Sequence, residues 1–270
     1  IWSGRSYEYR PQDIPSWKYL HLRRLISTYI VIASILMSLT KSCTVPGLDP
    51  FLALTKTYAG RDKVTKAVQY GSRLFMYMLL KNDPKNDLGQ RFKGLFAMSR
   101  DARKLWRFPN MAQEYKSILT ALDNTKDGKV IQWLTVLSRA GFAWYWLNDT
   151  IVYLCKAKFL TFEPTSVTLH ANRGWFIGIV FGLLIQFVQL RDNLEKEDSA
   201  KAGPDASAAT VALLKDRTSI LLKIVAGFGD LPVAANGFNL TQSVLGWQFN
   251  DGVLGAGGLI SALIAAYQLL

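Results

Sequence analysis

The sequence predicts an all-α membrane protein, with amphipathic helices in its N-terminal half and about two membrane-spanning helices. Three observations support this fold class. Half of the 270 residues are apolar, which is enough for an extensive set of buried or lipid-covered helices. Residues 174–190 and 252–270 contain no charged side chain. Residues 91–108 combine a basic face with an apolar one.

Residues 1–48 form a leader whose pattern differs from that of the rest of the chain. Within it, residues 25–40 carry no charge, but as a helix they would rise only about 24 Å, which is short for a bilayer core of about 30 Å. The chain starts at Ile1, and its first methionine is Met37. We therefore expect the natural product to begin at Met37, with residues 1–36 as upstream translated sequence.

An amphipathic helical region is expected over residues 49–160. Its first helix begins near Pro50, a residue suited to a first helical turn, and ends at the turn residues 82–84. A further helix covers about residues 110–122. Residues 129–160 are rich in aromatic residues, but Arg139 and Asp149 interrupt their apolar run, so we interpret them as interfacial or packed in a bundle.

The stretch 91–108, drawn as a helix, separates basic from apolar side chains. This composition is typical of a helix in a bilayer interface, whose basic face binds anionic headgroups while its apolar face inserts below them. A surface helix of a soluble bundle has the same period and stays open as an alternative. The expected membrane-binding residues are the basic Lys93, Arg100, Arg103, Lys104 and Arg107 and the apolar Phe92, Leu95, Phe96, Leu105 and Trp106.

Residues 161–270 are expected to anchor the chain in a membrane. As helices, residues 174–190 and 252–270 would rise about 25 Å and about 28 Å, close to the length that a bilayer requires. Residues 191–217 are charged and rich in Ala, Gly and Ser, which predicts a flexible linker. Residues 218–238 are apolar but include charged residues and a proline, so we expect a partly buried or re-entrant segment there.

Small residues recur every four positions in the last apolar stretch. Gly258, Ala262 and Ala266 form one row, and Gly255 lies on an adjacent row. Rows of this kind let helix backbones approach closely in lipid. We expect these four residues to be the helix-packing positions through which copies of the chain associate.

The net charge of +12 predicts an anionic partner. Anionic phospholipid fits better than nucleic acid, because residues 91–108 place their aromatic and basic side chains on opposed faces. The sequence contains no phosphate-binding glycine loop, no set of metal ligands and no catalytic constellation. We therefore expect neither an enzyme nor a bound cofactor or metal.

Four charged residues in apolar surroundings leave a second function open. A channel for small metabolites would need polar residues along a path, and the candidates are Arg139, Asp149, Lys223 and Asp230. Ion pairs inside a helical bundle are the plainer interpretation of the same residues.

Residues 58–74, YAGRDKVTKAVQYGSRL, resemble the signature of the peroxin-eleven family, the membrane proteins of peroxisome proliferation. The basic helix and the glycine-rich end resemble further parts of that family, and the resemblance extends from about residue 50 to the end. The final residues 269–270 depart from the pattern, because an aromatic residue often stands there. The motif residues that match in place are Gly60, Arg61, Asp62, Lys63, Gln69, Tyr70, Ser72 and Arg73.

This resemblance implies an integral protein of the peroxisomal (or glycosomal) membrane, with its N-terminal half facing the cytosol. It implies that the protein remodels and elongates the membrane and promotes peroxisome proliferation and fission. It further implies self-association and contact with the fission machinery, a dynamin-related GTPase and its adaptors. Some members of the family are proposed to conduct small metabolites.

Overall fold

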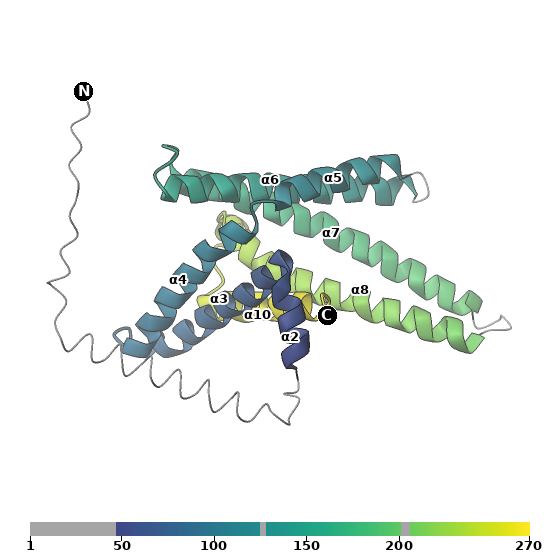
Figure 1. Cartoon of the computed structure of the whole chain (residues 1–270), viewed down its shortest axis with the longest axis horizontal. Coiled ribbons are helices and arrows are strands. Elements are labelled where there is room, and N and C mark those ends of the chain that lie inside the picture. The colour runs from purple at the N-terminus through teal and green to yellow at the C-terminus, as the bar shows by residue number, and fades with distance from the viewer. Residues whose placement is uncertain (1–46, 125–127, 201–205) are drawn as a thin grey trace. The chain divides into compact units, whose positions relative to one another are not determined.

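A computed structural model describes residues 47–124, 128–200 and 206–270 of the chain (Figure 1). Within these ranges the regular structure is α-helical, with no strand, which confirms the all-α prediction. The expected start at Met37 and the apolar run 25–40 lie outside the described residues. The helices are α2 (Leu48–Lys56), α3 (Tyr58–Leu80), α4 (Asp87–Trp106), α5 (Asn110–Asp123), α6 (Lys129–Lys156), α7 (Pro164–Ala200), α8 (Ala206–Asn236), α9 (Leu240–Leu245) and α10 (Asp251–Tyr267).

The predicted first helix is in fact two helices, α2 and α3, which are divided at Thr57. The Thr57 backbone is extended, with φ −92° and ψ 148°, and its hydroxyl accepts a hydrogen bond from the Gly60 amide at 2.9 Å. Glycine is required at position 60, because a Cβ there would lie 1.8 Å from the Leu54 carbonyl oxygen. After a turn, Asn86 caps α4 in the same way, accepting from a backbone amide of the first helical turn at 2.9 Å.

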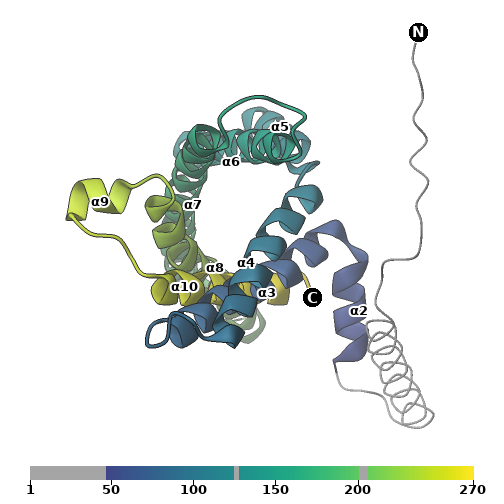
Figure 2. The same cartoon turned by 90° about the vertical axis from the view of Figure 1, so that its left-hand side faces the viewer.

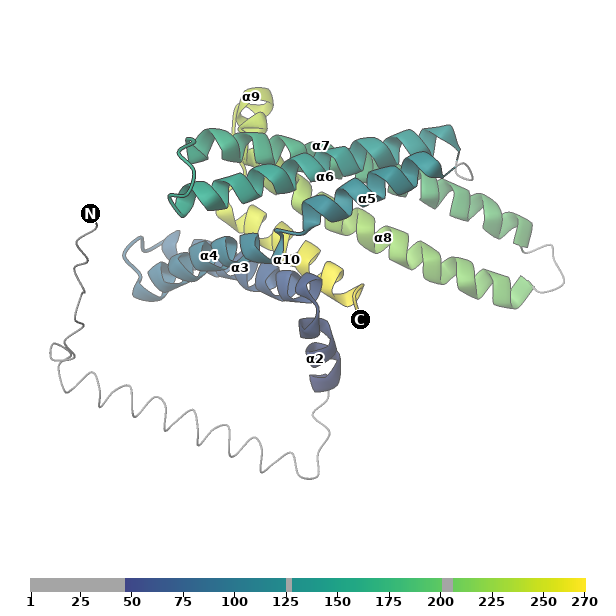
Figure 3. The same cartoon turned by 45° about the horizontal axis from the view of Figure 1, so that its top comes forward.

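The residues from Leu52 to Leu270 form one compact unit in which consecutive helices pack side by side. Figure 1 shows α3 beside α4, α5 beside α6, and α7 beside α8. The last helix, α10, lies against both α3 and α8, so it joins the beginning of the unit to its end (Figure 3). Seen end-on, α4, α6, α7, α8 and α10 are arranged in a ring (Figure 2).

Two apolar clusters hold this unit together. One is formed by α7 and α8, where Ile179 and Leu183 pack against Ile220 and Ile224. The other lies where α3, α8 and α10 meet and contains Leu254, which is only 2% exposed. Closely packed side chains gain many dispersion contacts, and these contacts hold helices together in lipid as well as in water.

The linker predicted over residues 191–217 is largely helical. Helix α7 and helix α8 extend through this stretch from either end, and residues 201–205 between them lie outside the described part. Arg217 forms an ion pair with Glu197 and donates from Nε to Asn193 Oδ1 at 3.0 Å. The charged composition suggested a flexible linker because it does not reveal that Arg217 of α8 pairs with Glu197 of α7.

Among the described residues, two helices are long and apolar enough to cross a membrane, which confirms the expected number. The first candidate span, Pro164–Glu197, lies in α7 and contains the predicted segment 174–190. The second, Thr210–Asn236, lies in α8. The prediction placed the second span at 252–270, but α10 has 17 residues and would rise only about 25 Å.

The segment 218–238 was predicted to be partly buried or re-entrant. It is partly buried, but most of it belongs to the continuous helix α8 and is not re-entrant. The helix continues without a break through Pro232. Asp230 is compensated by Lys66 of α3, whose Nζ lies 2.7 Å from Asp230 Oδ2. Counting the charged residues of the segment therefore overestimated the free-energy cost of placing it in a membrane. The charge of Asp230 is compensated by Lys66, which lies far away in the sequence.

Candidate functional site

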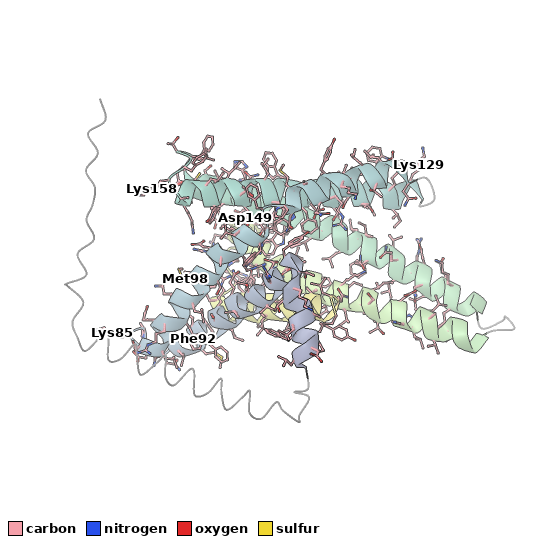
Figure 4. All side chains as sticks on the ribbon, in the orientation of Figure 1. Lys85, Phe92, Met98, Lys129, Asp149 and Lys158 are labelled. Atoms are coloured by element: carbon pink, nitrogen blue, oxygen red, sulfur yellow. The ribbon has the colours of Figure 1, made fainter. Side chains whose placement is uncertain are left out.

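The basic amphipathic stretch predicted at 91–108 corresponds to α4 and the residues that follow it. One face of this helix is apolar and exposed: Leu95 is 45%, Met98 70% and Leu105 53% accessible to solvent. The opposite face is basic, and near the end of the helix it is buried, with Arg103 and Lys104 at 4% and 9%. Figure 4 labels Met98 on α4. Near its end the helix thus turns its basic side chains toward the protein, while Met98 and Leu105 face away from it.

Asp62 of α3 is the first carboxylate that the basic face meets. Arg103 donates from Nε to Asp62 Oδ1 at 2.9 Å and from Nη1 to Gln69 Oε1 at 2.7 Å. Arg107, which directly follows α4, donates from Nε to the same Asp62 oxygen at 3.0 Å. Hydrogen bonds between charged groups are about twice as strong as neutral ones, so these contacts fix the orientation of α4 on α3.

Asp149 of α6 is the second carboxylate. Lys104 forms an ion pair with it, and Arg107 donates from Nη1 to Asp149 Oδ2 at 3.2 Å and to the Tyr145 hydroxyl at 2.8 Å. Figure 4 shows Asp149 on α6, near the end of α4. Arg107 therefore links α3 to α6. We call the five residues Asp62, Arg103, Lys104, Arg107 and Asp149 the buried charge cluster.

The electrostatics of the cluster keep its two carboxylates ionised. Burial by itself raises the pKa of Asp62, but the charges of Arg107 and Arg103 outweigh it and hold that pKa well below its usual value. Burial also raises the pKa of Asp149, but the charges of Arg107 and Lys104 outweigh it, so that this pKa is lowered as well. Burial also lowers the pKa of Lys104, against the attraction of Asp149.

Three of the five basic residues expected at lipid headgroups therefore lie elsewhere. Arg103, Lys104 and Arg107 are buried and bind carboxylates, so in this fold they do not reach a membrane surface. Lys93 and Arg100 are exposed. The helical period identified the basic face, but it cannot show whether that face meets lipid or the carboxylates of other helices.

The aromatic residues of α4 also differ from the expectation. Phe92 stacks on Phe75 of α3 with ring centroids 5.3 Å apart. An arginine of α3 lies over Phe96 and another over Trp106, with the guanidinium carbons 5.4 Å and 5.5 Å from the ring centroids. These three rings are half-buried. The exposed apolar residues of α4 and its end, which we call the outer face, are Leu88, Leu95, Met98, Leu105 and Phe108.

The motif of α3 supplies much of the polar contact that holds the unit together. Arg73 forms an ion pair with Asp251 at the start of α10, with Nη2 and Oδ1 2.6 Å apart. Tyr70 is 4% exposed and lies against Gly258 of α10. The other motif positions are Gly60 at the start of α3, Asp62 and Gln69 facing α4, Arg61 over Trp106, Lys63 beside Asp62, and Ser72 in the interior.

A second polar cluster, which the sequence did not predict, joins α3, α8 and α10. Lys66 donates to Asp230 Oδ2 at 2.7 Å and to the Ser261 hydroxyl at 2.8 Å, and that hydroxyl donates to the same carboxylate at 2.7 Å. Burial lowers the pKa of Lys66 to about 8, against the attraction of Asp230. One feature of the sequence could have indicated that Lys66 is buried: it follows Asp62 by four residues and so lies on the same side of α3.

The candidate pore residues are mostly engaged in ion pairs. Asp149 and Asp230 bind the cations described above, and Arg139 lies 3.3 Å from a carboxylate oxygen of Glu114. Lys223 is exposed on α8. This arrangement agrees with the plainer interpretation of these residues as ion pairs within a bundle.

The small residues of α10 pack within the chain. A Cβ on Gly255 would lie 2.6 Å from a backbone nitrogen of α3, and one on Gly258 would lie 2.3 Å from the Tyr70 ring. Ala262 is fully buried, and Ala266 is half-buried. The surface that Gly255 and Gly258 were expected to offer to a second copy is therefore occupied by α3.

Residues 48–270 match the family described as Peroxisomal biogenesis factor 11 (PEX11). The chain belongs to the PEX11 family. The match starts at the first residue of α2 and includes every helix described above, so it confirms the resemblance carried by the motif of α3.

Relatives in this family are similar over most of their length. The chain is 24% identical over 246 residues to the peroxisomal membrane protein 11 homolog of Dictyostelium discoideum, which covers 82% of this chain and 94% of the relative. It is 24% identical over 246 residues to peroxisomal membrane protein 11A of Mus musculus, with 80% and 94% covered. No solved structure matches the chain. The names of these PEX11 relatives agree with the two candidate spans found in α7 and α8.

Proposed function

We propose that this PEX11-family chain is an integral protein of the peroxisomal membrane that remodels and elongates the membrane and so promotes peroxisome proliferation and fission. The family, the names of the relatives and the two candidate spans support this location. The role is structural rather than catalytic. The protein acts by the shape and chemistry of the surface that it presents to lipid.

The observation that carries this proposal is the outer face of α4. Its five large apolar side chains are exposed, although water is an unfavourable environment for them by about 25 cal/mol for each Å² of apolar surface. Contiguous exposed apolar surface of this kind marks a site of interaction with a membrane or a partner. In a chain with two candidate spans, the hydrocarbon of the bilayer is the environment that covers it.

The buried charge cluster makes α4 a rigid wedge rather than a loosely attached peptide. Arg103 and Arg107 hold the helix against α3 and α6, so its apolar side has a fixed direction. Lys93 is exposed and binds an anionic headgroup, contributing about 1 kcal/mol near the surface. Insertion of the outer face expands one leaflet relative to the other, and this difference in area bends the membrane.

Anionic phospholipid is the direct partner of α4. We place the N-terminal half of the chain on the cytosolic side, where association of several copies and contact with a dynamin-related GTPase and its adaptors lead to fission. Gly255 and Gly258 face α3, so contacts between copies use other surfaces of the chain.

Tubulation of liposomes by the reconstituted full chain tests this function. We compare the wild type with the double variant Leu95→Glu/Leu105→Glu in liposomes that contain anionic phospholipid. The double variant Leu119→Glu/Leu122→Glu is the matched control, because these leucines of α5 are 45% and 44% exposed. We expect the α4 variant to lose tubulation and the control to retain it.

Two results would contradict the proposal. One is unaltered tubulation by the α4 variant when carbonate extraction shows that it is still inserted in the liposomes. The other is an equal loss in both variants, which would mean that α4 has no special role.

A further inference from the structure

A cavity that is partly open to solvent lies on the inner side of α4, and the proposed function does not use it. Its volume is about 390 Å³, and it is lined by residues of α3, α4, α6, α7, α8 and α10. All of these helices except α3 belong to the ring seen in Figure 2. Trp175 and Phe96 contribute aromatic surface to the wall. The basic lining residues are Arg73, Arg100, Arg103, Lys104 and Arg107.

The charge around this cavity is not balanced. In the buried charge cluster three cations share two carboxylates, those of Asp62 and Asp149, and among the lining residues Asp149 alone is acidic. Arg73 adds no surplus, because it is paired with Asp251. The cluster therefore holds one positive charge more than its carboxylates neutralise. A surplus charge in a buried site is unfavourable unless an anion compensates it.

Arg100 gives this cavity an accessible binding group. Its side chain is 48% exposed, and its Nε lies 3.7 Å from Asp101 Oδ1, which is longer than a hydrogen bond. The guanidinium carbon lies 5.7 Å from the Phe96 ring centroid. The planar fork of donors on an arginine matches the oxygens of a phosphate group, and Arg103 and Arg107 stand deeper in the same wall.

We propose that this cavity binds a phosphate group, which enters past Arg100 and neutralises the surplus charge of the buried charge cluster. The volume lies near the lower end of the range for small-molecule sites, about 300–1,000 Å³, and accommodates a phosphate with a small substituent. The phosphate belongs to a phospholipid headgroup or to a soluble phosphate ester. The site lies on the inner side of α4 and is separate from the outer face that meets the membrane.

Thermal unfolding of the full chain in an uncharged detergent tests the proposal with two probes. Glycerol 3-phosphate represents a soluble ester, and phosphatidic acid in mixed micelles represents a headgroup. We expect one of them to raise Tm in a saturable manner, compared with chloride at equal ionic strength. A response to glycerol 3-phosphate assigns the site to soluble esters, and a response to phosphatidic acid alone assigns it to lipid. The absence of a response to both overturns the proposal.

A pair of variants separates the cavity from general attraction to a basic surface. Arg100→Gln removes the accessible arginine, and Arg91→Gln removes another exposed arginine of α4 that is also next to an aspartate. We expect Arg100→Gln to weaken binding at least tenfold and Arg91→Gln to leave it within twofold. Equal weakening by the two variants means binding at the surface and overturns the proposal.

A third variant supplies the missing negative charge from the protein itself. Thr168 of α7 lines the cavity, and its hydroxyl donates to the Pro164 carbonyl of its own helix at 2.7 Å. We expect Thr168→Glu to raise Tm without any probe and to abolish the response to the probe. An unchanged response contradicts the proposal. If Thr168→Glu does not fold, the comparison of Arg100→Gln with Arg91→Gln decides whether the phosphate binds in the cavity.

Discussion

Asp62 and Asp149 each accept hydrogen bonds from two cations of α4 and its end. Burying an arginine or a lysine is costly unless a carboxylate compensates it, so these two aspartates determine which way the basic face of α4 points. The apolar face is then left outward. Single residues of α3 and α6 therefore decide that the end of this helix exposes Met98 and Leu105 and buries Arg103 and Lys104.

We expect Asp149→Asn to lower the free energy of unfolding by about 3–5 kcal/mol, because it leaves Lys104 and Arg107 buried without their shared carboxylate. The matched control is Asp87→Asn, which breaks the exposed pair with Arg91, with side chains 78% and 74% accessible. That change should cost at most about 1 kcal/mol. Denaturant unfolding of the full chain in uncharged detergent, followed by circular dichroism, measures both. Equal losses would contradict the role of the buried charge cluster.

The lowered pKa of Asp62 predicts how stability depends on pH. Below about pH 4, the unfolded carboxyl binds a proton while the folded one, whose pKa is lower, stays ionised. The contribution of Asp62 is therefore fully present above about pH 4 and is lost as the pH falls through its folded pKa. We expect the cost of Asp62→Asn to be largest at pH 6 and to shrink steadily at lower pH. A cost that is independent of pH would show that the ion pairs of Asp62 contribute nothing.

At the scale of single elements, local pattern was a good guide to where helices lie and a poor guide to where they face. The spacing of apolar residues placed helices at 91–108 and 110–122, and the structure has Asp87–Trp106 and Asn110–Asp123. The spacing could not show which face of α4 is buried. A basic face can contact lipid headgroups or the carboxylates of a neighbouring helix, and both arrangements give the same spacing. The division at Thr57 was also missed, since a threonine cap is a small local signal.

The packing of α10 on α3 gives a prediction at this scale. A Cβ on Gly255 would lie 2.6 Å from a backbone atom of α3, whereas a Cβ on Gly94 of α4 would meet nothing within 4 Å. We expect Gly255→Ala to destabilise the chain by about 1–3 kcal/mol through overpacking. Gly94→Ala should stabilise it by about 0.5–1 kcal/mol through helix propensity. The same unfolding measurement applies, and a stabilised Gly255→Ala variant would show that α10 does not pack on α3 in this way.

At the scale of the whole molecule, the sequence indicated the fold class, the number of candidate spans and the family. It could not indicate which charges meet, because Lys66 and Asp230 are 164 residues apart and are brought together by the packing of three helices. For the same reason the charge of Asp230 argued against a membrane-spanning helix at α8, although Lys66 compensates that charge in the fold. Tertiary pairing is the information that a single sequence lacks here.

If the candidate spans α7 and α8 both cross the membrane, they do so in opposite directions. The start of α7 and the end of α8 then lie on one side of the membrane, and the end of α7 and the start of α8 lie on the other. We expect Phe162→Cys and Val244→Cys, both at exposed positions, to react from the same side with an impermeant maleimide. Lys196→Cys, at an exposed position near the end of α7, should react from the opposite side. The variants are made in a background that lacks Cys43 and Cys155, and opposite sidedness of positions 162 and 244 would contradict the two-span arrangement.

The most direct test of the central claim is to ask what surrounds the outer face of α4 in a bilayer. A spin label at Met98→Cys, in the same cysteine-free background, is compared with one at Lys85→Cys in the exposed turn before α4. We expect the label at position 98 to be relaxed strongly by oxygen, which concentrates in lipid, and weakly by a water-soluble nickel complex. The label at position 85 should show the reverse. A label at position 98 that is reached by nickel as readily as the one at position 85 would contradict the account.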